Sequence, residues 1–175
     1  MDYDEHTLAL AKNIKLVIFD VDGVLTDGGL YFTDDGREIK KFNVRDGLGI
    51  SLLVKTGIEV AVITGRNSVI VAERMKSLGV SHVYQGRMNK LETYENLKLA
   101  LEITDQEVAF VGDDIIDLPI MKVCALPVAV GDAHDDVKNQ AALVVPQLGG
   151  HGAARAVCDL VMQAQNLSYD FTASQ

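Results

Sequence analysis

Short apolar runs alternate with longer amphipathic segments along this chain. Six runs rich in valine, isoleucine and alanine predict strands, over residues 14–20, 58–64, 81–86, 107–113, 125–132 and 141–146. Several of these runs are apolar at nearly every position, which is typical of strands that are covered on both faces. The pattern therefore predicts a parallel sheet buried between two layers of helices.

The segments between the runs have the period of amphipathic helices. They predict helices over residues 46–57, 67–79, 89–103, 114–124 and 152–166. The second of these begins at an Asn/Ser cap and ends at Gly79. Strands that alternate with helices indicate an α/β fold, a Rossmann-like parallel sheet with helices on both faces.

One segment departs from this alternation. Residues 29–43 alternate between apolar and polar positions around Asp35-Gly36, which predicts a β-hairpin inserted after the first strand. A flexible tail is expected from about residue 166 to residue 175. Otherwise the length suits a single domain over residues 1–175.

Composition and charge indicate which kinds of binding partner and which cellular environment are expected for this chain. The formal net charge of −9 disfavours nucleic acids and anionic membrane surfaces as partners. No apolar run is long enough for a membrane span, and the first residues lack the pattern of a signal peptide. Cys124 and Cys158 have no CxxC spacing, so reduced, buried thiols in a cytoplasmic protein are expected.

Polar side chains follow three of the predicted strands directly. Asp20 and Asp22 follow the first strand, Thr64 and Arg66 the second, and Asp113 the fourth. Because the carboxyl ends of parallel strands meet at one edge of the sheet, we expect these side chains to converge. Acids after one strand are usually solvated, but acids after two strands with Thr and Arg after a third indicate a site.

The residue types at this edge suit phosphoryl chemistry. Asp20 and Asp113 together would suit a hard cation such as Mg²⁺. With a cation present, Asp20 could attack a phosphate as a covalent nucleophile, while Asp22 served as general acid and base. Thr64 could donate a hydrogen bond to a phosphoryl oxygen.

Lys90 is predicted at the start of a helix, where the helix dipole disfavours a cation. An anion shared with the helix N-terminus would explain it, although a surface lysine is the plain alternative. Asp117 lies one turn beyond Asp113, so it could orient Lys90 or metal-bound waters. Asp114 is either part of the metal surroundings or a simple helix N-terminal acid.

Four segments, "DVDGVLTD", "VITGR", Lys90 and "GDDIID", resemble in order and spacing the four motifs of the haloacid dehalogenase superfamily of phosphatases. The resemblance implies that Asp20 is the nucleophile, that Asp22 is the acid/base, and that Thr64 and Lys90 bind phosphate. It also implies Mg²⁺ as cofactor, bound by Asp20, Asp113 and the backbone carbonyl of Asp22.

The spacing of the motifs leaves no room for a cap domain. The interval from Asp20 to Thr64 holds only the hairpin and one helix, and that from Thr64 to Lys90 holds one helix and one strand. A capless site is open to water unless a neighbouring subunit covers it. We therefore expect a homo-oligomer with the hairpin at the contact.

Residues 23–50 and "GGHGAAR" (149–155) resemble one capless subgroup, the tetrameric 3-deoxy-D-manno-octulosonate 8-phosphate phosphatases of lipopolysaccharide biosynthesis. By this resemblance, the glycine-rich stretch can reach a neighbour's active site. The residues that would bind the sugar acid and its phosphate are Asp22, Asn43, Val44, Arg45, Asp46, Gly47, Arg66, Arg74 and Lys90.

Several alternatives stay open on the sequence alone. The substrate could be a nine-carbon sugar acid 9-phosphate, or a broad range of small phosphate esters. A receiver-like phospho-accepting switch uses similar residues, but its acids, acceptor and lysine come in another order. Asn43 and Arg45 could merely join the hairpin to the next helix, with Asp46 as its cap, and Gly149–Gly152 could be a flexible turn.

Overall fold

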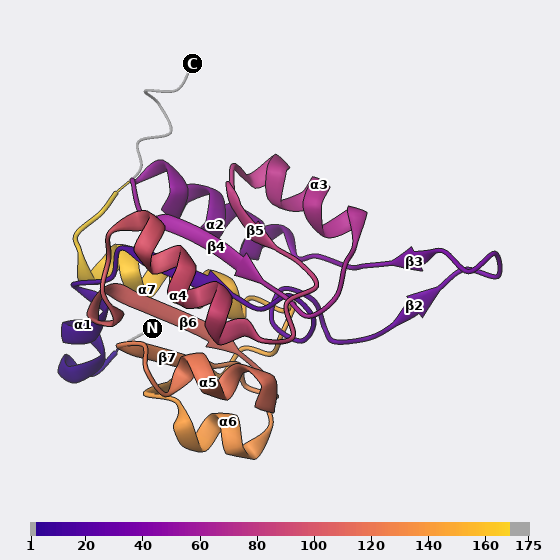
Figure 1. Cartoon of the computed structure of the whole chain (residues 1–175). Coiled ribbons are helices and arrows are strands. Elements are labelled where there is room, and N and C mark those ends of the chain that lie inside the picture. Colours follow the sequence, from indigo (N-terminus) through magenta and orange to yellow (C-terminus); the bar gives the residue numbers. More distant parts are fainter. Residues whose placement is uncertain (1–2, 169–175) are drawn as a thin grey trace.

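The computed structural model describes residues 3–168, and these form one six-stranded parallel sheet with helices on both faces (Figure 1). The strand order is β5-β4-β1-β6-β7-β8. The strands are β1 (Leu16–Phe19), β4 (Glu59–Ile63), β5 (His82–Tyr84), β6 (Val108–Gly112), β7 (Leu126–Ala129) and β8 (Leu143–Val144). All six predicted strands are confirmed, each shorter than predicted.

Four of the predicted helices are confirmed: α2 (Val44–Lys55), α3 (Val69–Leu78), α4 (Lys90–Leu101) and α7 (Ala153–Ala164). The segment predicted as one helix over 114–124 is a 3₁₀ turn, η2 (Ile115–Asp117), followed by the short α5 (Leu118–Met121), whose first turn contains Pro119. The sequence analysis missed α1 (Glu5–Ala11), η1 (Asp105–Glu107) and α6 (Asp135–Gln140), which are too short for a clear helical period.

The helices form two layers around the sheet. Helix α7 packs against α1 and α2 on one face, and α2 also contacts α3. On the other face α4 contacts α5, and both lie in front of the sheet in Figure 1. Every residue of β1, β6 and β7 is buried, as expected for strands covered on both sides. Cys124 and Cys158 are buried and free, as predicted.

The predicted hairpin is present but has short strands, β2 (Tyr31–Phe32) and β3 (Glu38–Ile39), with Tyr31 opposite Ile39. It projects from the body of the molecule (Figure 1). Its apolar side chains are exposed, with Phe32 at 60% and Ile39 at 50%. The hairpin therefore presents apolar surface that the rest of the described chain does not cover.

The connections between the motifs contain no cap domain. The hairpin and α2 lie between β1 and β4, and α3 and β5 lie between β4 and α4. Within residues 3–168, no helix is long and apolar enough to cross a membrane. Most of the predicted flexible tail, residues 169–175, lies outside the described part of the chain.

Candidate active site

The order of the strands brings the predicted residues together. Strand β1 lies between β4 and β6, so Asp20, Thr64 and Asp113 follow three adjacent parallel strands. Ligands bind at such an edge, where connections leave the central strand in opposite directions. The backbone N–H of Asp20 donates to the Val111 carbonyl at 3.0 Å, which extends the β1–β6 pairing to Asp20.

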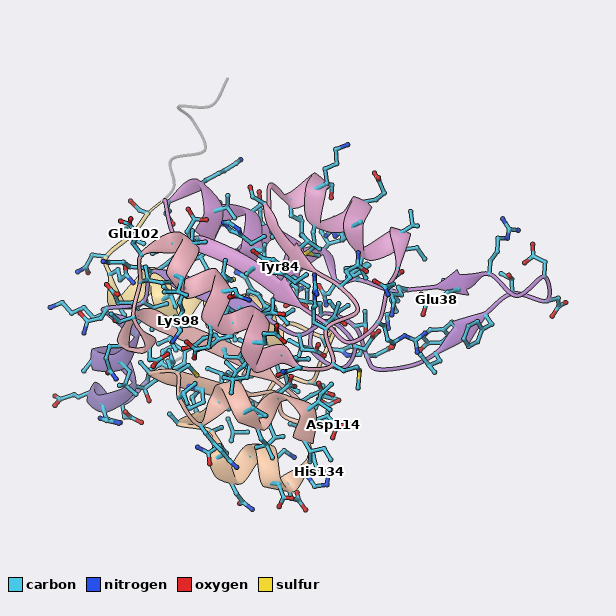
Figure 2. All side chains as sticks on the ribbon, in the orientation of Figure 1. Glu38, Tyr84, Lys98, Glu102, Asp114 and His134 are labelled. Atoms are coloured by element: carbon cyan, nitrogen blue, oxygen red, sulfur yellow. The ribbon has the colours of Figure 1, made fainter. Side chains whose placement is uncertain are left out.

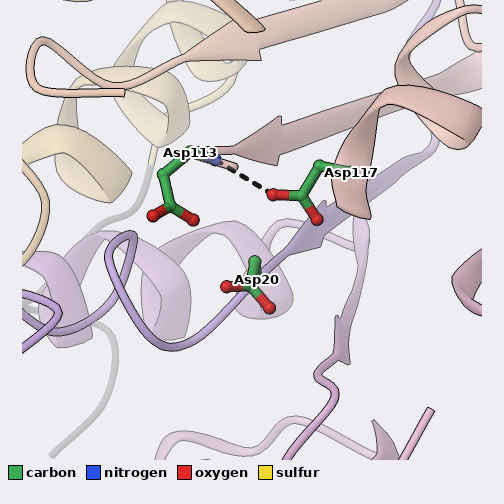
Figure 3. A group of neighbouring side chains, drawn as sticks. All are labelled: Asp20, Asp113 and Asp117. Carbon is green, nitrogen blue, oxygen red and sulfur yellow. Dashed lines mark hydrogen bonds between the residues drawn. The ribbon is translucent and has the colours of Figure 1, made fainter. Parts of the chain in front are cut away.

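Three carboxylates form the centre of this edge. One oxygen from each of Asp20, Asp113 and Asp117 lies within 4.8 Å of the others (Figure 3). Both oxygens of Asp117 already have partners: Oδ1 is 2.7 Å from Lys90 Nζ, and Oδ2 accepts the Asp113 backbone N–H at 3.0 Å. Asp117 therefore orients Lys90, which leaves Asp20 and Asp113 as the carboxylates for a cation. Asp114 is exposed, and its side chain caps η2.

Lys90 is the first residue of α4 and is only 2% exposed, so it is not a surface lysine. Its Nζ lies 2.6 Å from Asp20 Oδ1 as well as 2.7 Å from Asp117 Oδ1. Burial would lower the pKa of Lys90, but the two carboxylates outweigh this effect and raise it. The lysine thus remains charged beside Asp20.

The site carries more negative charge than Lys90 can balance. Burial, together with the charges of Asp20 and Asp117, raises the pKa of Asp113 to about 8. Burial also raises the pKa of Asp20, although Lys90 opposes this shift. Crowded carboxylates with raised pKa values, at oxygen-ligand distances, are the donor set that a divalent cation would stabilise. The residues present therefore fit Mg²⁺.

A second charge cluster lies where the hairpin leaves the body of the molecule. Lys40 forms an ion pair with Asp22 and lies 3.5 Å from Glu38 Oε1. Arg66 Nη2 is 2.7 Å from the same Glu38 oxygen, and its Nε is 3.8 Å from Asp22 Oδ2. Figure 2 shows Glu38 on β3. The sequence analysis missed Glu38 and Lys40, although both stand on the same face of a predicted strand.

Comparison with known proteins agrees with this geometry. Residues 78–157 match the family model described as haloacid dehalogenase-like hydrolase. The chain is 49% identical over 160 residues to the 3-deoxy-D-manno-octulosonate 8-phosphate phosphatase KdsC of Salmonella typhimurium, covering 91% of this chain and 85% of that protein. The chain belongs to this family of haloacid dehalogenase-like phosphatases. The resemblance drawn from the four motifs is confirmed.

Solved structures of the family share the fold. The 3-deoxy-D-manno-octulosonate 8-phosphate phosphatase of Yersinia pestis matches with a TM-score of 0.92 and 45% identity, over 93% of this chain and 88% of that one. The Moraxella catarrhalis phosphatase matches with a TM-score of 0.91 and 38% identity, over 94% of each chain. That structure holds a magnesium ion, a phosphate ion and a KDO molecule. Mg²⁺ is thus confirmed as the cofactor at the level of the family.

The substrate-binding segment expected from the family lies at the start of α2. Asn43 is the N-cap of α2, and its side chain accepts the Arg45 backbone N–H at 2.8 Å. The alternative in which Asp46 caps this helix is wrong: Asp46 is already inside α2, and its carboxylate accepts hydrogen bonds from the start of α7. Arg74 lies beside Gly47, where an added Cβ would be 2.1 Å from Arg74 Nη2.

The glycine-rich stretch 149–152 packs on the loop that follows β1 in its own chain. Gly150 N–H donates to the Val24 carbonyl at 2.9 Å. A Cβ added to Gly149 would lie 1.8 Å from the Gly23 carbonyl oxygen. Gly149 and Gly150 are both buried, so in this chain the stretch is a packed element of the site and not a free turn.

Proposed function

We propose that this protein hydrolyses 3-deoxy-D-manno-octulosonate 8-phosphate to the free sugar acid and phosphate, with Mg²⁺ as cofactor, in lipopolysaccharide biosynthesis. The observation that carries the proposal is the buried Asp20–Lys90–Asp117 group beside Asp113, in a chain 49% identical to a phosphatase of that substrate. We also propose that the protein is cytoplasmic.

In the first half-reaction, a carboxylate oxygen of Asp20 attacks phosphorus and the bond from phosphorus to the ester oxygen breaks. Asp22 gives its proton to the leaving sugar alkoxide. Lys90 and Thr64 stabilise the charge on the transferring group, and most of the catalysis is positioning and electrostatics. Mg²⁺, held by Asp20, Asp113 and the backbone carbonyl of Asp22, would neutralise the charge that otherwise keeps a carboxylate from a phosphate.

In the second half-reaction, Asp22 takes a proton from a water molecule, and the resulting hydroxide attacks the phosphorus of the aspartyl-phosphate. The bond from phosphorus to the Asp20 oxygen breaks, so phosphate leaves and the carboxylate of Asp20 is restored. The Asp22 side chain is 21% exposed beside its ion pair with Lys40, so solvent reaches it.

The sugar acid extends from the phosphate toward the hairpin and α2. The carboxylate of the sugar acid would be bound by cationic side chains. Because the protein has a net negative charge, these side chains must lie close to the substrate. Arg66 is held by Glu38 at the base of the hairpin, and Arg45 is exposed at the start of α2. Arg74 adds a third guanidinium beside Gly47. These side chains support a substrate with a second anionic group.

A homotetramer, with the hairpin at the subunit contacts, is part of the proposal. The exposed apolar residues Leu30, Tyr31, Phe32 and Ile39 support it, because monomers rarely expose such a cluster. Light scattering of the purified protein should give four times the chain mass. A monomer at micromolar concentration would contradict this part of the proposal.

The test is phosphate release with Mg²⁺ from matched concentrations of the eight-carbon sugar acid 8-phosphate, its nine-carbon analogue and an aryl phosphate. The proposal predicts a strong preference for the eight-carbon substrate. It also predicts that Asp20→Asn folds but loses at least about a thousandfold in kcat on all three. Equal rates on the three esters would contradict the substrate, and an active Asp20→Asn variant would contradict the mechanism.

A further inference from the structure

Asp46 is a buried carboxylate in the segment that the family resemblance assigns to substrate binding. It is 2% exposed, and both of its oxygens have backbone partners at the N-terminus of α7, one at the N-cap Gly152 and one at Arg155. Oδ2 accepts the Gly152 backbone N–H at 3.1 Å, and Oδ1 accepts the Arg155 backbone N–H at 2.8 Å. These are donors that the first turn of a helix leaves unpaired. A side chain of α2 thus caps α7, which Gly152 at the N-cap position cannot do for itself.

Two further side chains hold the same stretch of backbone. Asn43 Nδ2 donates to the Gly150 carbonyl at 3.2 Å, and Asp132 Oδ1 accepts the Gly149 N–H at 2.9 Å. The glycine segment 149–152 is therefore fixed from α2 on one side and from the turn after β7 on the other.

The glycine segment in turn packs against residues 21–27, which we call the catalytic loop. Gly150 N–H donates to the Val24 carbonyl at 2.9 Å. A Cβ on Gly150 would lie 2.6 Å from the Thr26 carbonyl carbon, and one on Gly149 would lie 1.8 Å from the Gly23 carbonyl oxygen. Only glycine permits this backbone-to-backbone approach, so a shift of the segment displaces the loop.

The catalytic loop touches the reacting groups directly. It carries Asp22, and a Cβ added to Gly23 would lie 2.0 Å from Asp113 Oδ2. Contacts therefore link Asp46 to the glycine segment, the glycine segment to the catalytic loop and the loop to Asp113, and Asp22 is the chain neighbour of Gly23 in that loop.

We infer that Asp46 is a positioning residue: it fixes the glycine segment 149–152 against the catalytic loop and so sets Asp22 relative to Asp113. Its carboxylate is committed to the α7 backbone and does not bind the sugar acid. The inference rests on the proposed function for the reaction, but it concerns a step common to every phosphate ester that the site cleaves.

The two roles predict different kinetics. A residue that binds the sugar acid affects that substrate alone, mainly through KM. A residue that positions the loop affects all esters through kcat, because every ester uses the same acid/base and metal ligands. Small misplacements of reacting groups can cost up to about a hundredfold in rate. We expect Asp46→Ala to lower kcat by about ten- to a hundredfold on both the sugar acid phosphate and an aryl phosphate, with KM little changed.

The experiment compares Asp46→Ala and Asp46→Asn with the wild type on these two substrates, with Mg²⁺ present. Asp46→Asn keeps one carbonyl acceptor, so it should recover part of kcat. Asp4→Ala is the matched control, because Asp4 also caps a helix, accepting the Thr7 N–H at 2.7 Å, but caps α1 at the start of the chain. Amide hydrogen exchange over residues 149–155 reports the hydrogen bonds that Asp46 accepts from the backbone of Gly152 and Arg155. This exchange should be faster in both Asp46 variants.

Equal falls in kcat on both esters, with faster exchange at Gly152 and Arg155, are the expected result. A loss confined to the sugar acid phosphate, or unchanged kcat on both, would overturn the inference. If Asp46→Ala does not fold, Asp46→Asn decides between these results. If the wild type cleaves only the aryl phosphate, the proposed substrate fails, while the role of Asp46 is still decided on that ester.

Discussion

The two charge clusters of this site differ in how deeply their side chains are buried. The cluster around Lys90 is sealed: Lys90 and Asp117 side chains are fully buried, and Asp20 is nearly so. The cluster at the base of the hairpin is more open at Arg66, whose side chain is 44% exposed, whereas Lys40 in the same cluster is 3% exposed. A buried ion pair needs exact partners, whereas an exposed pair is weak and can exchange partners. The comparison suggests that the sealed cluster serves the invariant phosphoryl group, while the exposed Arg66 of the open cluster serves the sugar acid and Asp22 serves as acid/base for every ester.

The largest effect should come from opening the sealed cluster with Lys90→Ala. This change leaves Asp20 and Asp117 as buried carboxylates without their cation, which typically costs about 3–5 kcal/mol of unfolding free energy. We also expect kcat to fall by at least about a hundredfold on every ester, because charge stabilisation at the phosphoryl group is lost. Urea unfolding and steady-state kinetics measure the two effects.

Lys76→Ala, on the exposed face of α3, is the control for losing a lysine. If Lys90→Ala matched this control in both kinetics and stability, the sealed cluster would have no part in phosphoryl transfer.

A smaller effect is expected from Asp113→Asn. It concerns the pH dependence of the free energy of unfolding, measured without metal. The folded state holds the Asp113 proton up to a pKa of about 8, whereas the unfolded state releases it near pH 4. The unfolded state therefore binds fewer protons between these values, so wild-type stability should fall as pH rises from about 4 to about 8. Asp113→Asn should flatten this dependence.

Mg²⁺ gives the second readout for Asp113. It should stabilise the wild type, and more so at higher pH, because binding competes with the proton. The variant should lose this stabilisation. If Mg²⁺ did not change the melting temperature of the wild type at pH 8, the assignment of Asp113 as a ligand would be contradicted.

The smallest effect should come from the open cluster. Glu38→Gln weakens the hold on Arg66, and since the pair is partly exposed we expect KM for the sugar acid phosphate to rise only about two- to fivefold. Hydrolysis of an aryl phosphate, which has no carboxylate, should change less, because Glu38 is linked to Asp22 only through Lys40 and Arg66. The control is Asp35→Asn at the hairpin tip, where Asp35 pairs with Arg37 in solvent. Equal losses on both esters would show that Glu38 serves the phosphoryl group and would break the distinction between the clusters.

The sequence predicted the sealed cluster better than the open one, for a physical reason. Asp20, Thr64 and Asp113 follow apolar runs, and parallel topology brings strand ends together whatever the details of the loops. Lys90 stood out because a cation is unfavourable at a helix start. The position of Asp117 near Asp113 follows from the spacing of one helical turn between them.

The contacts of Lys40 and Asp46 could not be predicted in this way. Lys40 reaches Asp22 across the hairpin, and Asp46 reaches Arg155 over 109 positions of sequence. Such contacts depend on how whole elements dock, which local periodicity does not encode. Short α1 and α6 were missed for a related reason, since their helical character depends on caps and on packing against the sheet.

The most direct test of the central claim is to trap the phosphorylated side chain. The wild type is mixed with Mg²⁺ and the sugar acid phosphate, quenched within one turnover and treated with borohydride, which reduces an acyl phosphate but not a free carboxylate. Mass spectrometry of the digested protein should then show Asp20 converted to homoserine, and Asp113 and Asp117 unchanged. Substrate turnover without any modification at Asp20 would contradict the account.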